Sequence, residues 1–560
     1  MWFKQIRVVS LLLVLVVGVV PALFAAQPPA AAIASAHPLA TQAGLRILKQ
    51  GGNAFDAAIT VTAMLAVVEP AGSGIGGGGF WLLHETDKNN NTMIDGRERA
   101  PLAAHRNMYL DKQGQPVADA SLNGPLAAGI PGEPAALVYL AEHYGRLPLS
   151  KTLEPAIRAA RLGFPVGEHY RRMVGMRKEV LLAHGAGDVF LDRDAVPKRG
   201  WVLRQPQLAR TLEMLASKGR AGFYEGELAA KLVNGVQKAG GIWSLNDLKS
   251  YKVKERKPVS ASYNGFRISS AALPSSGGIV LAQMLNMLSG FELSSLDPVK
   301  RQHLVIESMR LAYRDRARYL GDKDYIKVSE GWLTSKDYAD LLRKRIDTIS
   351  ATPSVFMSGK RHRPKGNDTS HFSVIDKEGN RVAATLSVNY PFGSGFMASG
   401  TGVVLNNEMD DFSIKPGVPN VYGLVGNEAN AIAPGKRPLS SMSPTFIEND
   451  DGVLIIGTPG GSRIITMVLL AALEMMEGRG SVKDWVSLPR YHHQYLPDVV
   501  TIEPGAMSAV ERSKLEAMGH TIKERESTYG NMHAVYWDKK KDKVEAASDP
   551  RGEGMAVVVD

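Results

Sequence analysis

The sequence predicts a mixed α/β (α+β) protein built around a large core. Helical periodicity dominates residues 39–68 and about 135–350, whereas paired strand patterns follow residue 370. The chain has 560 residues and 44% of them are apolar, which is ample for one large domain or several smaller ones. It contains no cysteine, which excludes disulfides and thiolate nucleophiles, so the fold depends on its core.

The N-terminus has the pattern of a secretory signal peptide. Lys4 and Arg7 precede an apolar run at 8–20, and small residues follow it. The run is too short to predict a membrane anchor. We therefore expect residues 1–26 to be removed and the mature protein to be periplasmic or secreted, with no membrane association. The candidate cleavage positions follow Ala25, Ala26 and Ala32.

The chain is basic, with a formal net charge of +10 and a pI of about 9.4. Such a charge makes an anionic substrate or surface plausible. Part of the excess lies in a connector at 350–368 and in a lysine run at 539–541, where charges are normally solvated. Nothing resembling a nucleic-acid-binding module accompanies it, so we expect no nucleic-acid partner.

The mature chain opens with two predicted helices. Residues 39–50 form the first, which ends at Gly51 and Gly52. Asn53 is positioned to cap the second, a largely apolar helix at 54–68.

A glycine-rich segment follows these helices. Its residues Gly74, Gly76 and Gly79 satisfy the G-x-G-x-x-G pattern of dinucleotide-binding folds. In those folds a strand precedes the glycines and a helix follows, whereas here a helix precedes them and a strand at 80–84 follows. We therefore reject a nucleotide site and expect the glycines to let backbones approach closely beside a pocket.

Two further polar motifs have competing interpretations. Arg97 lies in a turn-flanked segment and its guanidinium could hold a carboxylate bidentately, although a lone arginine of this kind more often lies on the surface. His492 and His493 are adjacent, so their side chains diverge and a structural role is favoured over metal binding. No cluster with metal-ligand spacing is found in the sequence, and we expect no metal or other cofactor.

The segment around Thr369 is the strongest candidate for chemistry. A polar, basic, turn-rich connector ends at Asp368, and two strand patterns at 371–376 and 381–388 follow as a predicted hairpin. If the chain is cut between Asp368 and Thr369, the threonine gains a free α-amine whose pKa of about 8 suits a general base for its own hydroxyl. Taken by itself, the segment favours an ordinary threonine at a strand edge over a catalytic one.

Polar residues concentrate downstream of Thr369. Ser387 and Asn389 end the second strand of the hairpin, residues 406–412 follow a short predicted strand, and residues 436–444 open another. At 455–476 a strand, two glycines and an apolar helix follow one another, which presents free backbone N–H groups of the kind an oxyanion needs.

Together these motifs make the sequence resemble the γ-glutamyltranspeptidase family of the N-terminal nucleophile hydrolase superfamily. The resemblance runs from about His37 to Pro550. Its motifs occupy residues 37–40, 51–54, 56–58, 73–78, 368–371, 407–413, 438–444, 459–463 and 548–551. It implies a four-layer αββα sandwich, made as a precursor that cuts itself into a large subunit (27–368) and a small subunit (369–560) that stay together as a heterodimer.

The resemblance also implies roles for individual residues. Thr369 would be the nucleophile for self-cleavage and catalysis, with Ser387 in the place of a supporting threonine and Gly460 and Gly461 as the oxyanion hole. Serine keeps the supporting hydroxyl but lacks the β-branch that restricts χ1. The substrate α-carboxylate would be held by Arg97, Ser440 and Ser441, and its α-amino group by Asn389, Glu408 and Asp411. Residues 416–434, with Tyr422, resemble a lid loop over the pocket.

The activity implied is γ-glutamyl transfer and glutathione hydrolysis. A γ-glutamyl donor has a zwitterionic head that an arginine and two carboxylates complement, and an ester on Thr369 would pass to water or to an amino acid or dipeptide acceptor. A related cephalosporin (glutaryl) acylase, a poly-γ-glutamate depolymerase and a secreted non-enzymatic binding protein remain alternatives. Glu408 and Asp411 argue against the acylase, because a glutaryl group has no amine to pair with them.

Overall fold

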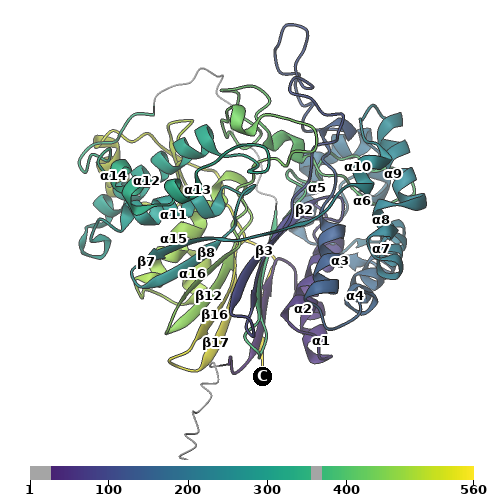
Figure 1. Cartoon of the computed structure of the whole chain (residues 1–560), viewed down its shortest axis with the longest axis horizontal. Helices are drawn as coiled ribbons and strands as arrows, with labels where there is room; N and C mark the ends of the chain where they lie inside the picture. The colour runs from purple at the N-terminus through teal and green to yellow at the C-terminus, as the bar shows by residue number, and fades with distance from the viewer. Residues whose placement is uncertain (1–26, 355–368) are drawn as a thin grey trace, which may run out of the picture.

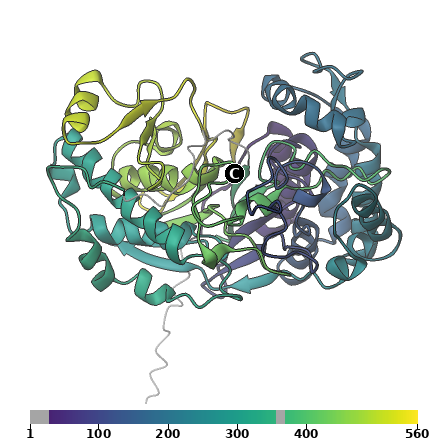
Figure 2. The ribbon, with the colours of Figure 1, turned by 90° about the horizontal axis from the view of Figure 1, so that it is seen from above.

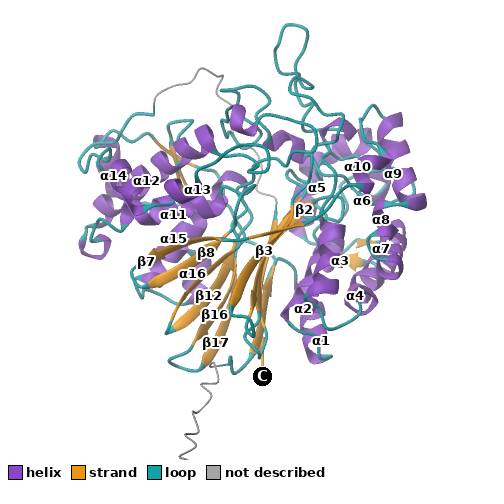
Figure 3. Cartoon of the chain, in the orientation of Figure 1, coloured by secondary structure: helices purple, strands orange, loops and turns teal. Residues whose placement is uncertain are grey.

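In the computed structural model, which describes residues 27–354 and 369–560, two β-sheets stack face to face between two layers of helices (Figures 1 and 3). Seen from above, the helices of the first 250 residues lie on one side and those of the later segments lie on the other (Figure 2). The predicted four-layer αββα sandwich is therefore confirmed.

One sheet has seven antiparallel strands. Their order is β18 (Met555–Val559), β1 (Ala31–Ser35), β9 (Ser370–Ile375), β10 (Arg381–Ser387), β2 (Gly78–Glu85), β3 (Asn90–Gly96) and β6 (Lys254–Arg256). Its central position goes to β10, whose Ser387 pairs with Gly78 of β2. The strand that follows Thr369, β9, thus lies between the N-terminal strand β1 and its own hairpin partner β10.

The other sheet has six antiparallel strands. Their order is β17 (Lys543–Ser548), β16 (His533–Asp538), β12 (Gly452–Gly457), β11 (Thr445–Asn449), β8 (Phe266–Ser270) and β7 (Val259–Tyr263). Buried apolar side chains fill the space between the sheets, among them Phe80, Phe446 and Trp537. Two small sheets complete the strands: β13 (Tyr491–His492), β14 (Val500–Ile502) and β15 (Ile522–Glu524), and β4 (Phe164–Pro165) with β5 (Val202–Leu203).

Helices from the first 250 residues cover the seven-stranded sheet and share one apolar core with it. They are α1 (Pro38–Lys49), α2 (Ala54–Val68), α3 (Glu133–His143), α4 (Leu149–Leu162), α5 (Glu168–Ala183), α6 (Gly187–Phe190), α7 (Pro206–Lys218), α8 (Ala221–Tyr224), α9 (Gly226–Lys238) and α10 (Leu245–Lys249).

A second core joins the remaining helices to the six-stranded sheet. These helices are α11 (Gly277–Leu288), α12 (Pro298–Tyr319), α13 (Glu330–Leu333), α14 (Lys336–Arg343), α15 (Ile464–Met476), α16 (Val482–Ser487) and α17 (Ala509–Ala517). Short 3-10 turns are η1 (Pro125–Ala127), η2 (Leu293–Ser295), η3 (Glu408–Asp411), η4 (Glu428–Asn430) and η5 (Gly461–Arg463). Within the described residues, no helix combines the length and apolarity that crossing a membrane requires.

The position of strand β1 reduces the number of candidate cleavage sites for the signal peptide. Ala31 and Ala32 pair with β18 inside the sheet, and Ala32 also pairs with Ile375 of β9, so cleavage after Ala32 would remove two residues of a buried strand. The structure therefore favours cleavage after Ala25 or Ala26. The predicted signal peptide itself and Asp368 lie outside the described residues.

Candidate functional site

Thr369 lies at the end of a buried strand, next to the hydroxyl that was predicted to support it. It directly precedes β9 and is 9% exposed, and its Oγ1 lies 3.4 Å from Oγ of Ser387 at the end of β10. The glycine-rich segment packs against both strands. A Cβ on Gly72 would lie 3.3 Å from the Thr369 carbonyl oxygen, and one on Gly77 would lie 2.2 Å from that of Ser387. The predicted close backbone approach is confirmed.

Asn389 joins the nucleophile region to the polar turn beyond it. Its backbone N–H donates to Ser387 Oγ at 2.8 Å, and its side-chain amide donates to the Asn407 carbonyl at 2.9 Å. The residue has φ of 75°, a left-handed conformation that asparagine tolerates better than most residues. Since Ser387 Oγ accepts from Asn389, its own proton is left for another partner such as Thr369 Oγ1.

Arg97 is buried at the centre of a charged cluster, so the alternative of a surface arginine is wrong. Its side chain is 1% exposed, and its two terminal nitrogens lie 2.6 Å from Glu408 and 2.6 Å from Asp411, both in η3. Nε donates to the Pro438 carbonyl at 3.2 Å. The three residues predicted to bind opposite ends of a zwitterion thus pair with one another.

Burial favours the neutral form of each group in this cluster, whereas the attraction between opposite charges favours the charged forms. Burial disfavours the charge of Arg97, but Glu408, Glu98 and Asp411 more than offset it and hold the pKa of Arg97 above its ordinary value. Burial raises the pKa of Glu408 above its ordinary value, against the opposing effect of Arg97. A second cation placed beside Glu408 would therefore favour its ionised form.

The serine pair is fixed by contacts from the other helical layer. The backbone N–H of Ser440 donates to the Pro274 carbonyl at 2.8 Å, and its Oγ accepts from the N–H of Met442 at 3.1 Å. Ser441 Oγ accepts from a terminal nitrogen of Arg316 on α12 at 3.1 Å. The Ser440 backbone and the Ser441 hydroxyl are therefore held by segments distant in sequence, whereas the Ser440 hydroxyl is held by a local contact.

The two glycines lie where β12 turns into η5 and α15. Gly460 has φ of 142° and Gly461 has φ of 58°, conformations that favour glycine. Within the described part of the chain, neither amide donates to another backbone group. A Cβ on Gly461 would lie 2.4 Å from the Tyr422 ring, so a side chain there would collide with the residue above it.

The segment at 416–434 covers the site, and several hydrogen bonds hold it there. The Tyr422 hydroxyl donates to the Asn389 carbonyl, the Asn420 amide donates to Asp411 at 3.1 Å, and the N–H of Val421 donates to Asp410 at 2.9 Å. The position of the segment agrees with the lid that the resemblance implied.

These groups line one small cavity. Its lining includes the predicted residues Arg97, Thr369, Ser387, Asn389, Glu408, Asp411, Tyr422, Ser440, Ser441 and Gly461. Gly460 adjoins Gly461 but is not among the lining residues. The structure therefore brings together almost the entire predicted site from segments up to 364 residues apart, namely 97 and 461.

Sequence reasoning missed two side chains that support this cavity. Gln494 accepts from Ser462 Oγ at 2.7 Å and donates to the Tyr422 carbonyl at 3.3 Å, so it links the lid to the turn carrying the two glycines. Arg316 contacts Ser441 as described above. Neither residue carries a local sequence signal, because its partners lie far along the chain.

One group of potential metal ligands was also missed. His303 and Glu307, one turn apart on α12, meet His520 in the interior. However, the two histidine rings are hydrogen-bonded at 2.8 Å, and Glu307 accepts from Arg310 Nε at 3.0 Å. Since these lone pairs are engaged and a guanidinium adjoins them, we assign no metal there.

The two adjacent histidines take separate partners, in line with the predicted structural role. Nδ1 of His492 lies 2.9 Å from Thr466 Oγ1, and Nε2 of His493 lies 3.0 Å from Asp498.

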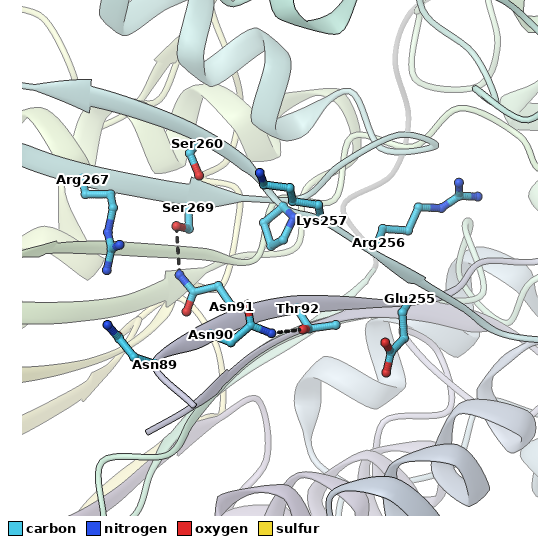
Figure 4. A pocket seen from close by; sticks show the side chains of 11 residues that line it. Asn89, Asn90, Asn91, Thr92, Glu255, Arg256, Lys257, Ser260, Arg267 and Ser269 are labelled. Atoms are coloured by element: carbon cyan, nitrogen blue, oxygen red, sulfur yellow. Dashed lines mark hydrogen bonds between the residues drawn. The ribbon is translucent and has the colours of Figure 1, made fainter. Parts of the chain in front are cut away.

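A wider hollow of about 1040 Å³ lies between β3 and the β6–β8 segment (Figure 4). Two of its cations are already paired: Arg256 lies 2.9 Å from Asp95 and Arg267 lies 2.7 Å from Glu448. Ser269 Oγ accepts from the Asn91 amide at 3.1 Å. No predicted site residue lines it, so we place the candidate site at Thr369.

Comparisons with known proteins show which family the chain resembles over most of its length. A family model described as gamma-glutamyltranspeptidase matches residues 40–559. The chain is 42% identical over 525 residues to the glutathione hydrolase proenzyme of Escherichia coli (strain K12), covering 93% of this chain and 90% of that protein. It is 39% identical to the glutathione hydrolase proenzyme of Pseudomonas aeruginosa, covering 96% of both.

Solved structures show the same fold. A cephalosporin acylase from Bacillus halodurans superposes with a TM-score of 0.83 at 28% identity, covering 95% of this chain and 96% of that chain. A chain of the Helicobacter pylori gamma-glutamyltranspeptidase superposes with a TM-score of 0.56 at 40% identity, covering 57% of this chain and 92% of that chain.

Proposed function

Because this chain belongs to the γ-glutamyltranspeptidase family, we propose that it is a self-processing γ-glutamyltransferase and glutathione hydrolase. The observation that carries the proposal is the shared cavity, in which Thr369 faces the Arg97–Glu408–Asp411 cluster. Such a cluster suits a substrate that bears both a carboxylate and an ammonium group beside the bond to be cut.

Substrate binding is an exchange of ion pairs. Arg97 can turn from Glu408 and Asp411 to the α-carboxylate, joined by the hydroxyls of Ser440 and Ser441. The two carboxylates then pair with the α-ammonium, assisted by Asn389. Each buried charge keeps a partner before and after binding, so no unpaired charge is left in the cavity.

The reaction follows from the position of Thr369. Its Oγ attacks the γ-amide carbon while its free α-amine takes the hydroxyl proton, and the amides of Gly460 and Gly461 bind the resulting oxyanion. The proton passes to the leaving amine, the C–N bond breaks, and a γ-glutamyl ester remains on Thr369. Water or the amine of an amino acid or dipeptide then attacks the ester and restores the threonine.

The free α-amine requires cleavage between Asp368 and Thr369. The names of the relatives include the word proenzyme, which supports maturation by cleavage. The products would be a large subunit (27–368) and a small subunit (369–560). Because β9 of the small subunit pairs with β1 of the large one, and β11 pairs with β8, both sheets hold the subunits together as a heterodimer.

We further propose that the mature protein is periplasmic or secreted. The proposal rests on the signal-peptide pattern at 1–26, which precedes strand β1. The substrates of the mature protein would be glutathione and other γ-glutamyl compounds.

The acylase alternative is supported by the similarity to the Bacillus halodurans enzyme over 95% of this chain. Glu408 and Asp411 oppose it, because a glutaryl group would place a methylene beside two buried carboxylates.

A pair of anilide substrates distinguishes the two functions. A γ-glutamyl anilide and a glutaryl anilide with the same leaving group differ only by the α-amine. We expect kcat/KM of the processed enzyme to be at least about 100-fold higher for the γ-glutamyl compound. Equal values, or a preference for glutaryl, would establish the acylase instead and leave the Thr369 chemistry intact.

A further inference from the structure

Arg316, on the buried face of α12, is a cation without a carboxylate partner. It is 5% exposed, its Nε donates to Ser276 Oγ at 3.0 Å, and a terminal nitrogen donates to Ser441 Oγ at 3.1 Å. Among residues 27–354 and 369–560, no carboxylate oxygen lies within the 4.0 Å ion-pair distance of its guanidinium. Burial lowers the pKa of Arg316, which reflects this unfavourable surrounding.

An unpaired buried charge is costly, so its retention requires a reason. Arg97 shows the contrast, since Glu408 and Asp411 neutralise it at 2.6 Å each. Arg316 has only two serine hydroxyls, which carry no net charge. The positive charge of Arg316 is therefore not balanced by a carboxylate within ion-pair distance among the described residues.

Arg316 lies next to the candidate site without lining it. It lines a neighbouring cavity that shares Asp411 and Leu424 with the cavity at Thr369. Ser441 lines the Thr369 cavity and accepts from Arg316, so its hydroxyl stands between the guanidinium and the substrate space.

The hydrogen bond from Arg316 to Ser441 decides how the Ser441 hydroxyl can bond to a further group. A guanidinium can only donate, so Ser441 Oγ must accept and its own proton is free to point elsewhere. A hydroxyl that accepts from a cation is also a stronger donor. Ser441 is thereby prepared to donate to an anion in the Thr369 cavity.

We propose that Arg316 is a positioning residue for the α-carboxylate of the substrate. It orients the Ser441 hydroxyl toward that carboxylate and supplies the positive charge that the carboxylate compensates. The inference rests on the proposed function and adds a second arginine to the carboxylate side of the site.

The test uses two substrates that differ only in the α-carboxylate. A γ-glutamyl anilide carries this group, whereas the 4-aminobutyryl anilide has the same amine, chain length and leaving group without it. For Arg316→Gln we expect kcat/KM to fall about 30-fold or more with the γ-glutamyl anilide, mainly through KM, and less than about 3-fold with the 4-aminobutyryl anilide. If the latter reacts too slowly, its competitive Ki is compared instead.

Two further variants separate positioning from folding. Arg316→Lys retains the charge but not the planar fork, so it should recover part of the loss with the γ-glutamyl anilide, and it serves as the test if the glutamine variant does not fold. Arg318→Gln, on the exposed side of the same helix, is the matched control and should behave as wild type with both substrates.

Equal losses with both substrates, or no loss with either, would overturn the inference. If the wild-type enzyme did not cleave the γ-glutamyl anilide at all, the proposed function itself would fail, and that outcome is distinct from either of these.

Discussion

The two ends of the cavity are built differently. At one end, Thr369 Oγ1 has a long 3.4 Å contact to the hydroxyl of Ser387, both uncharged groups. At the other end, the buried Arg97 forms two 2.6 Å ion pairs, with Glu408 and Asp411. The binding end is thus built from charges that are already paired, whereas under the proposed mechanism the reactive end gains its base only when cleavage forms an α-amine at Thr369.

This difference has a chemical reason. Recognition of a zwitterion depends on charges fixed before the substrate arrives, because their reorganisation would reduce affinity. If Thr369 had a permanent base as a neighbour, its hydroxyl would be reactive before the rest of the site had formed. Changes at the reactive end should therefore act mainly on kcat, and changes at the binding end should alter affinity and selectivity.

The largest effect is expected at the nucleophile. Thr369→Ala removes the hydroxyl that both cleavage and catalysis require, so the variant should remain one chain and lose more than about 1000-fold in kcat. Intact mass under denaturing conditions measures the first outcome and anilide cleavage the second. A processed and active alanine variant, or a wild-type small fragment that begins anywhere but Thr369, would contradict the assignment.

The next largest effect is expected at Arg97. Arg97→Lys keeps the charge but loses the planar fork that reaches two partners, so kcat/KM for γ-glutamyl substrates should fall by about 2–5 kcal/mol in transition-state stabilisation. Self-cleavage should continue, because the substitution leaves the hydroxyl of Thr369 in place. Kinetics near wild type with glutathione would show that Arg97 does not bind the substrate.

A third prediction concerns Asp410, which accepts from Val421 of the lid. Burial raises the pKa of Asp410 to about 7 from 3.8, so between these values the folded chain binds a proton that the unfolded chain does not. Stability should therefore fall as pH rises from about 4 to about 7, by at most about 4 kcal/mol. Asp410→Asn should lose this dependence.

Thermal unfolding of Asp410→Asn at several pH values, in the uncleaved Thr369→Ala background, measures the effect on a single chain. The exposed Asp450→Asn is the matched control and should keep the wild-type slope. A slope that Asp410→Asn leaves unchanged would assign the pH dependence to other groups.

The smallest effect is expected at Ser387, whose hydroxyl makes the long contact with Thr369 Oγ1 at the reactive end. Ser387→Thr adds the β-branch that restricts χ1, which should hold the hydroxyl nearer Thr369 Oγ1 and raise kcat by about twofold. The affinity for the substrate should not change, because the residue adjoins the nucleophile. A rise in KM without a rise in kcat would show that the methyl group crowds the cavity instead.

Several elements of this protein were determined by local sequence. The predicted helix 54–68 is α2, because Asn53 caps it through the N–H groups of Phe55 and Asp56 at 3.0 and 2.9 Å. The predicted helix at 464–476 is α15, and the hairpin at Thr369 is β9 and β10. Caps, turns and apolar runs act within a few residues, so they can be predicted from the chain alone.

Other features were decided only by tertiary contacts. The short strand predicted before residue 406 is wrong: that segment forms only an isolated bridge between Met397 and Val404. The sequence motif alone favoured an exposed Arg97, yet the fold surrounds it with carboxylates more than 300 positions away in the sequence. Strand pattern and side-chain exposure there depend on which neighbours the folded chain supplies.

Arg316 and Gln494 show most clearly that contacts between distant segments cannot be predicted from local sequence. A sequence can indicate that a motif supplies a serine or a glycine, as it did for Ser441 and Gly461, because those types recur in a local pattern. It gave no indication that an arginine 125 residues earlier would donate to that serine. Such a contact exists only once both sheets and their helices are packed, and the protonation and direction of each buried hydrogen bond follow from that packing.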